Sequence, residues 1–223
     1  MTFSGAVLAG GQSRRMGRDK AFVTHGGRPL AGIVRAALLE AGAAEVLSVG
    51  GDLWRLSRLG FAAIPDDAPG EGPLGGVLTA LRAAAAEQVA VLSCDLPHAS
   101  AATIRELLCQ TADDTDVVVA LLAGRPLPTH AVWRRESQEV LQDLFAGGER
   151  RLAAALGALR VRGVEVSRPD TLLDVDTPEG LAAARAVSGA GGGAPEESAG
   201  VGASVGRGAR AGRGADRTTG ARR

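Results

Sequence analysis

Long apolar runs are missing from this chain. None approaches the roughly 18–20 residues that a membrane-spanning helix needs, and the first residues show no basic region followed by a long apolar core. We therefore expect no membrane association and no signal peptide. Cysteine is scarce as well, since only Cys94 and Cys109 are present and they form no CxxC pattern. This argues against a disulfide framework and favours two ordinary thiols in the reducing cytoplasm.

Several catalytic signatures are also missing. The three histidines show neither HxxxH nor HExxH spacing, which argues against zinc chemistry. GxSxG occurs only at residues 202–206, within a glycine-rich stretch and not between a predicted strand and a predicted helix, so a serine hydrolase is not supported. The glycine-rich segment at residues 8–20 fits neither the P-loop pattern GxxxxGK(S/T) nor the dinucleotide pattern GxGxxG.

Lysine is almost absent: the chain has 24 arginines and one lysine, Lys20. Where arginine fills nearly every cationic position, a retained lysine indicates a site that needs a compact ammonium rather than a planar guanidinium. Chance placement is the alternative. Lys20 lies in a glycine-rich segment, which favours the first interpretation.

Charge and composition separate a body from a tail. The 223 residues carry no formal net charge, but residues 187–223 hold six arginines against three acids, so the remainder is negative. Such a body is no obvious nucleic-acid binder. The tail has 11 glycines after residue 188 and no aromatic residue, so it is expected to be disordered rather than an RNA-binding arm. We expect one domain over residues 1–187 and a disordered Gly/Ala/Arg-rich tail over residues 188–223.

Strand and helix patterns alternate along the body. This alternation predicts an α/β fold with a mainly parallel sheet covered by helices on both faces. We expect strands at residues 5–8, 45–49, 61–64, 89–93, 116–122, 128–134, 161–166 and 172–175. We expect helices near residues 30–40, 52–59, 77–86, 100–108, 137–145, 149–159 and 178–187.

The strongest motif is LAGGQSRRMGRDK at residues 8–20, directly after the first strand. Gly10 and Gly11 allow a ligand to approach the backbone closely, and their exposed N–H groups can form an anion-binding concavity. Arg14, Arg15 and Lys20 add positive charge that suits phosphate groups. An arginine-rich surface turn is the alternative, but the position after a strand favours ligand binding.

Two acidic positions indicate a magnesium site. Asp95 follows the buried strand at residues 89–93, and a carboxylate there points into the crevice where open α/β sheets bind ligands. Magnesium usually takes one or two carboxylates together with substrate phosphates. Asp176 is a candidate second ligand, although its role as a helix start before Pro178 explains it fully. For Asp95 the alternative is a turn before Pro97.

A second glycine-rich loop, GEGPLGG at residues 70–76, precedes a helix. Its backbone is a candidate for contacting a base edge, and an ordinary loop is the alternative. Asp66, just upstream, is a candidate for holding the ribose or base, or simply ends a strand.

These residues together resemble the molybdenum cofactor guanylyltransferases, a family within the nucleotidyltransferases of Rossmann-like three-layer α/β/α fold. The resemblance covers residues 5–184 and includes LAGGQSRRMGRDK, GEGPLGG, CDLP and DVDTPE in the expected order. GRPLP at residues 124–128 and GERR at residues 148–151 look like the family's substrate-side segments.

The resemblance implies specific roles. Arg15, Lys20 and Asp95 would stabilise charge during catalysis, and Asp95 and Asp176 would bind Mg²⁺. The expected nucleotide contacts are Leu8, Ala9, Gly10, Gly11, Ser13, Lys20, Asp66, Pro73, Leu74 and Asp95.

The implied reaction transfers GMP from GTP to molybdopterin carrying molybdenum and releases pyrophosphate. Molybdenum-insertion proteins and apo-molybdoenzymes are the implied partners. A cytidylyltransferase for the same cofactor, a sugar-phosphate nucleotidyltransferase and a non-catalytic nucleotide-binding or docking module stay open as alternatives. LAGG at residues 8–11 and PLGG at residues 73–76 favour guanine over cytosine.

Overall fold

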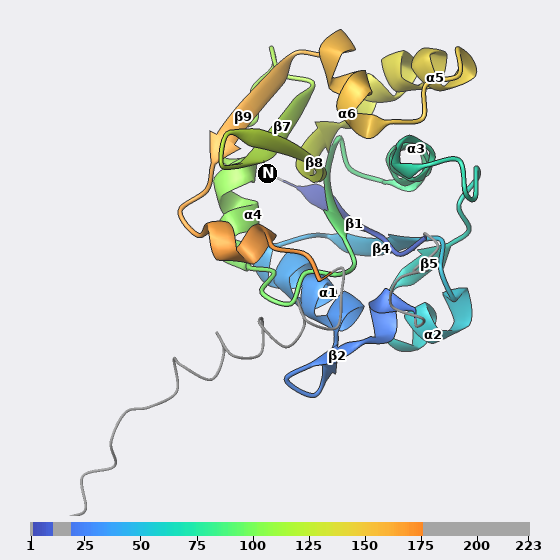
Figure 1. Ribbon diagram of the computed structural model, residues 1–223, viewed down its shortest axis with the longest axis vertical. Helices are drawn as coiled ribbons and strands as arrows, with labels where there is room; N and C mark the ends of the chain where they lie inside the picture. The colour runs from blue at the N-terminus through green and yellow to red at the C-terminus, as the bar shows by residue number, and fades with distance from the viewer. Residues whose placement is uncertain (1, 11–18, 176–223) are drawn as a thin grey trace, which may run out of the picture. The chain divides into compact units, whose positions relative to one another are not determined.

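A seven-stranded sheet organises the part of the chain that the computed structural model describes, residues 2–10 and 19–175 (Figure 1). These residues belong to one of the two units into which the chain divides, Met1–Gly191. The predicted helix at residues 178–187 and the predicted tail at residues 188–223 lie outside the described residues.

The sheet is mainly parallel, as predicted. In spatial order its strands are β5 (Ala62–Ile64), β4 (Glu45–Val49), β1 (Phe3–Leu8), β6 (Gln88–Ser93), β8 (Arg125–Arg134), β7 (Val117–Leu122) and β9 (Val161–Glu165). Only β8 runs against its neighbours β6 and β7, while the other pairs are parallel. The chain moves outward from β1 to β4 and β5 and then returns to β6 on the other side of β1, which creates a topological switch point.

Helices cover both faces of this sheet, which confirms the three-layer α/β/α prediction (Figure 1). One buried cluster joins the sheet to α1 (Leu30–Ala41), α2 (Leu53–Arg58) and α4 (Ala101–Leu108). The other joins it to α3 (Pro73–Ala83), α5 (Gln138–Ala146) and α6 (Leu152–Ala155). Between β1 and α1 lie a short 3₁₀ helix, η1 (Lys20–Phe22), and a small hairpin of β2 (Thr24–His25) and β3 (Arg28–Pro29). Further 3₁₀ turns are η2 (Arg135–Ser137), η3 (Leu156–Ala158) and η4 (Pro169–Leu172).

The local signals in the sequence explain several element ends. Helix α1 begins after Pro29 and ends at Gly42, whose φ of 105° suits a glycine at the left-handed cap. The Asp52 side chain accepts a hydrogen bond from the Arg55 N–H and caps α2 as predicted.

The predicted strand at residues 172–175 is wrong. The chain forms the 3₁₀ helix η4 up to Leu172, because Pro169 and Asp170 start a turn there. The apolar residues that suggested a strand contribute to the core without pairing in the sheet, since Leu172 and Val175 are both buried. The helix predicted at residues 149–159 is likewise shorter, being limited to α6 and η3.

None of the helices formed by residues 2–10 and 19–175 has the length and apolar character that crossing a bilayer requires.

The carboxyl ends of three strands meet at one level. Leu8 at the end of β1 is in register with Val49 of β4 and with Ser93 of β6. Beyond β1 the backbones come very close: a Cβ placed on Gly50, whose φ is +70°, would lie 3.0 Å from the Gly10 Cα. At this edge the backbones of Gly10 and Gly50 therefore pack directly against each other and leave no room for a side chain on Gly50.

We predict that Gly50→Ala destabilises the protein more than Gly42→Ala does. Both glycines have positive φ, so each alanine costs about 1–2 kcal/mol of backbone strain. A Cβ at Gly42 meets open space, whereas at Gly50 it collides with backbone, which adds roughly 1–3 kcal/mol. Urea unfolding of the two variants measures the difference. Equal losses would show that the Gly10 and Gly50 segments separate without cost.

Candidate functional site

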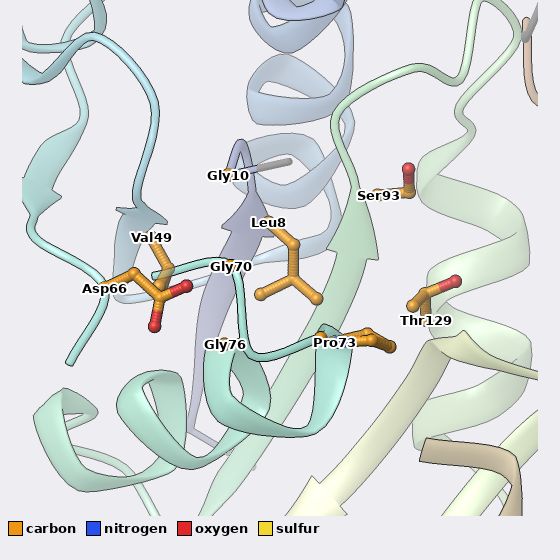
Figure 2. Close-up of a pocket in the computed structure, with 10 residues that line it drawn as sticks. Leu8, Gly10, Val49, Asp66, Gly70, Pro73, Gly76, Ser93 and Thr129 are labelled. Atoms are coloured by element: carbon orange, nitrogen blue, oxygen red, sulfur yellow. The ribbon is translucent and has the colours of Figure 1, made fainter. Parts of the chain in front are cut away.

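A cavity of about 500 Å³ opens at this carboxyl edge of the sheet, on the side covered by α3 (Figure 2). Its walls come from the ends of β1, β4 and β6, from the middle of β8, from Asp66 after β5, and from the first turn of α3 with the loop that leads into it. The lining residues are Leu8, Gly10, Val49, Asp66, Gly70, Gly72, Pro73, Gly76, Ser93 and Thr129. The cavity lies at the switch point of the sheet, where open α/β folds bind their ligands.

Four predicted nucleotide contacts lie at this cavity: Leu8, Gly10, Asp66 and Pro73. In Figure 2, Asp66 lies at one end and Ser93 and Thr129 at the other, with Leu8 between them. Leu8 and Gly10 thus border the same space as Gly70, Gly72, Pro73 and Gly76. The segment predicted as a loop at residues 70–76 is a loop only up to Gly72, because α3 already begins at Pro73.

Ala9 and Leu74 direct their side chains elsewhere. The Ala9 methyl packs in the cluster under α1, and Leu74 is fully buried among the α3 residues. Neither residue lines the cavity, and Leu74 has no exposed surface.

The Gly10 amide differs from the expectation of an exposed N–H group. Both Ala9 and Gly10 donate their N–H groups to the Val49 carbonyl, at 3.0 Å each. These bonds join the ends of β1 and β4, so the prediction that the Gly10 N–H is free for an anion is wrong. Because Gly10 has no side chain, it leaves the cavity open at this position.

Five residues singled out in the sequence lie outside the described residues. Gly11, Ser13, Arg14 and Arg15 belong to residues 11–18, and Asp176 follows the last described residue. Their predicted roles stay predictions.

Asp66 is held as an oriented hydrogen-bond acceptor. Its Oδ1 accepts from the Ala68 N–H at 3.0 Å and from the Thr79 hydroxyl at 3.4 Å. The second oxygen, Oδ2, faces Gly10, since a Cβ there would lie 3.7 Å from it. One carboxylate oxygen therefore fixes the side chain, and the other is directed at the cavity wall.

Lys20 and Asp95, 75 residues apart, form an ion pair. The Lys20 Nζ lies 3.0 Å from Asp95 Oδ2, and Asp95 is only 6% exposed. Ser93, which lines the cavity, donates its hydroxyl to Asp95 Oδ1, and the Val175 N–H donates to the Asp95 carbonyl at 3.0 Å. Lys20 and Asp95, two of the three predicted catalytic residues, thus stand side by side, next to the Ser93 end of the cavity.

The donor set at Asp95 fits a magnesium ion that shares its ligands with a substrate. Residues 2–10 and 19–175 contain no group of three or more His, Cys, Asp or Glu side chains that could hold a metal ion. A single carboxylate with phosphate oxygens and water is the usual magnesium arrangement in nucleotide sites. Asp95 supplies that carboxylate, but it does not supply a complete protein-only site.

Two buried neighbours of Asp95 remain neutral near pH 7. Burial, with the Asp95 charge as a second cause, raises the pKa of the Cys94 thiol to about 12, so this cysteine is no nucleophile. Burial lowers the pKa of His130 to about 4, although the Asp95 charge opposes this. The neutral His130 ring places Nδ1 3.2 Å from the Thr129 hydroxyl.

Ser93 and Thr129 are the polar cavity residues that sequence reasoning missed. Ser93 could have been found from its place at the end of the strand that precedes Asp95. Thr129 gave no such signal, because β8 enters the sheet antiparallel to β6 and local patterns do not show which strands become neighbours.

Known proteins resemble this chain over most of its length. A molybdenum cofactor guanylyltransferase from Rhodobacter capsulatus is 36% identical over 190 residues, which cover 82% of this chain and 95% of that protein. The enzyme of the same name from Pseudomonas entomophila (strain L48) is 34% identical over 179 residues, or 78% and 93% of the two chains.

The fold has a solved counterpart. The crystal structure of molybdopterin-guanine dinucleotide biosynthesis protein A from Archaeoglobus fulgidus matches with a TM-score of 0.68 at 23% identity. The match covers 85% of this chain and all of that one, and it supports the fold.

The family model described as the MobA-like NTP transferase domain matches residues 5–166. That span includes every residue that lines the cavity, together with Lys20 and Asp95. The chain therefore belongs to the MobA-like NTP transferase family.

Proposed function

We propose that this NTP transferase is a molybdenum cofactor guanylyltransferase, which transfers GMP from GTP to molybdopterin carrying molybdenum and releases pyrophosphate. The observation that carries the proposal is an oriented Asp66 carboxylate at one end of the cavity and a Lys20–Asp95 pair bonded to Ser93, which lines the other end. The names of the relatives at 34–36% identity support the guanine choice and the acceptor.

Asp66 suits the nucleoside end of GTP. A carboxylate only accepts hydrogen bonds, and guanine presents N–H donors on its base-pairing edge while the ribose presents hydroxyls. Because Oδ1 is already held by Ala68 and Thr79, Oδ2 can accept from the ligand without a rotamer change. Leu8, Pro73 and the main chain of Gly76 give the apolar and flat surface on which the nucleoside rests.

Lys20 and Asp95 suit the phosphate end. In the proposed reaction Lys20 and Arg15 neutralise phosphate charge, and Asp95, with Asp176 as a second candidate, holds Mg²⁺. A bound magnesium ion supplies charge neutralisation and orientation of the phosphates. The acceptor's terminal phosphate oxygen forms a bond to the α-phosphorus of GTP while the bond from that phosphorus to the bridging oxygen breaks and pyrophosphate leaves. Positioning and charge stabilisation are what the protein contributes.

The proposal also covers the domain bounds, the cellular location and the partners of the enzyme. We infer a catalytic domain over residues 1–187, a disordered tail over residues 188–223, and a place in the cytoplasm. Molybdenum-insertion proteins and apo-molybdoenzymes are the proposed partners, with no role for nucleic acid or membrane.

A comparison of nucleotide and acceptor substrates tests the proposed reaction. We predict pyrophosphate release with GTP and molybdopterin in magnesium buffer, at least tenfold above the rate with CTP, and no turnover with a sugar 1-phosphate as acceptor. A CTP preference would indicate the cytidylyltransferase, and turnover of sugar phosphates would indicate a metabolite nucleotidyltransferase. Either result would contradict the proposal.

Asp95→Asn separates an enzyme from a nucleotide-binding module. We predict that this variant loses about 10²–10³-fold in turnover, because an amide removes the charge that holds the metal and stabilises the reacting phosphates. Titration of the variant with Mn²⁺ in the presence of GTP, followed by electron paramagnetic resonance, should show weaker metal binding. Unchanged turnover and unchanged Mn²⁺ binding would show that Asp95 does not hold the metal, whereas GTP binding without turnover in the unmodified protein would leave a binding module as the better interpretation.

The variant Lys20→Arg tests whether the site needs a lysine or accepts any cation at this position. We predict at least a tenfold loss of turnover, although the charge is kept, because a guanidinium fork would hold Asp95 in a bidentate pair and release it poorly to the phosphates. A steady-state assay with GTP measures the effect, and near-normal rates would show that any cation serves at this position.

A further inference from the structure

We propose that Arg150 is a positioning residue that holds one wall of the nucleotide cavity, residues 70–73, in place for GTP. The inference rests on the proposed function. Arg150 itself does not line the cavity, so it would act through the wall it contacts.

The wall has little means of fixing itself. Gly70, Gly72 and Pro73 line the cavity, and both glycines have positive φ. Gly72 stands at the start of α3 without a side-chain cap. The Glu71 N–H donates to the Ala68 carbonyl at 3.1 Å. Among residues 70–72 only Glu71 has a side chain, so a side-chain contact from the rest of the protein to this loop must be made to Glu71.

Arg150 binds the Glu71 side chain. Its Nε donates to Glu71 Oε2 at 2.5 Å, while its Nη1 donates to the carbonyls of Phe145 at 2.7 Å and Glu149 at 2.9 Å. The guanidinium also stacks on the Phe145 ring, with its Cζ 4.0 Å from the ring centroid. The side chain thus links the cavity wall to the end of α5 through four contacts, which a lysine cannot reproduce together.

The main chain of Arg150 makes a second, independent contact with the wall. A Cβ placed on Gly72 would lie 2.9 Å from the Arg150 carbonyl oxygen, so the two backbones touch and only glycine fits. Glu149 fixes this carbonyl in turn, because its Oε1 accepts from the N–H groups of Arg150 at 2.9 Å and Arg151 at 2.8 Å. Hydrogen bonds from Arg151 and these N–H groups lower the pKa of Glu149 to about 2, so it stays charged at working pH.

The consequence concerns GTP affinity. A wall already ordered in the free protein need not be ordered when the nucleotide binds, and fixing even one residue's backbone costs about 1–2 kcal/mol. Losing the Arg150 contacts should therefore weaken GTP binding by about tenfold, which corresponds to about 1.4 kcal/mol.

Calorimetry of the full chain with GTP in magnesium buffer, without acceptor, tests the proposal. We predict that Arg150→Ala raises the Kd for GTP about tenfold, that Arg150→Lys and Glu71→Gln each raise it less, and that adding Glu71→Gln to Arg150→Ala has no further effect. At saturating GTP the kcat should stay within twofold of the unmodified protein, so the change appears in KM.

Arg160→Ala is the matched control. Arg160 forms an ion pair with Asp116, also at 2.5 Å, where β7 and β9 begin, at the edge of the sheet away from the cavity. Its removal should leave the Kd for GTP unchanged even if it lowers the free energy of unfolding. If Arg150→Ala does not fold, Glu71→Gln alone decides, since it removes only an exposed carboxylate charge.

Two results would overturn the inference. One is an unchanged Kd for GTP in Arg150→Ala or, should that variant not fold, in Glu71→Gln. The other is a rise confined to the KM of the acceptor, which would make Arg150 an acceptor contact. A failure of the unmodified protein to bind GTP would instead refute the proposed function on which the inference rests.

Discussion

The ion pair between Lys20 and Asp95 is the interaction on which the site depends. A carboxylate that is only 6% exposed at the end of a central strand would be strongly disfavoured without a partner, because burial removes its hydration. Lys20 supplies the opposite charge at 3.0 Å, and Ser93 and Val175 add hydrogen bonds to the same residue. The pair also joins η1 to the segment that follows β6.

This pairing explains why a lysine is retained in a chain that otherwise uses arginine. In the proposed reaction Lys20 binds phosphate and Asp95 binds magnesium, so each must exchange its present partner for a new one. A single ammonium makes one adjustable contact with the carboxylate, whereas a guanidinium would make two parallel ones. In this proposal Asp95 would hold the metal ion, which would supply positive charge beside the phosphates, and Lys20 would bind the phosphates.

The sequence predicted the fold better than it predicted the chemistry at the edge of the sheet. Buried strands such as β1, β4 and β6 were recognisable because apolar runs end in glycine or aspartate, and those ends are where the cavity lies. The hydrogen bond from the Gly10 amide to Val49 was not predictable, because it depends on how closely two distant strands approach. The strand predicted at residues 172–175 failed for a related reason: Leu172 and Val175 are apolar to fill the core, not to pair with a neighbour.

The same distinction applies to the two glycine-rich segments around the cavity. Glycine lets backbone approach a ligand closely, but it gives the rest of the protein nothing to hold, so each segment needs an anchor from elsewhere in the chain. Gly10 is anchored by the Val49 carbonyl, and the loop at residues 70–72 is anchored by Glu71 and the carbonyl of Arg150. Motif reading detects the glycines because they stand together, whereas their anchors lie about 40 and 80 residues away and become visible only in the folded chain. The shape of such a cavity is therefore set partly by residues outside its lining, such as Glu71 and Arg150.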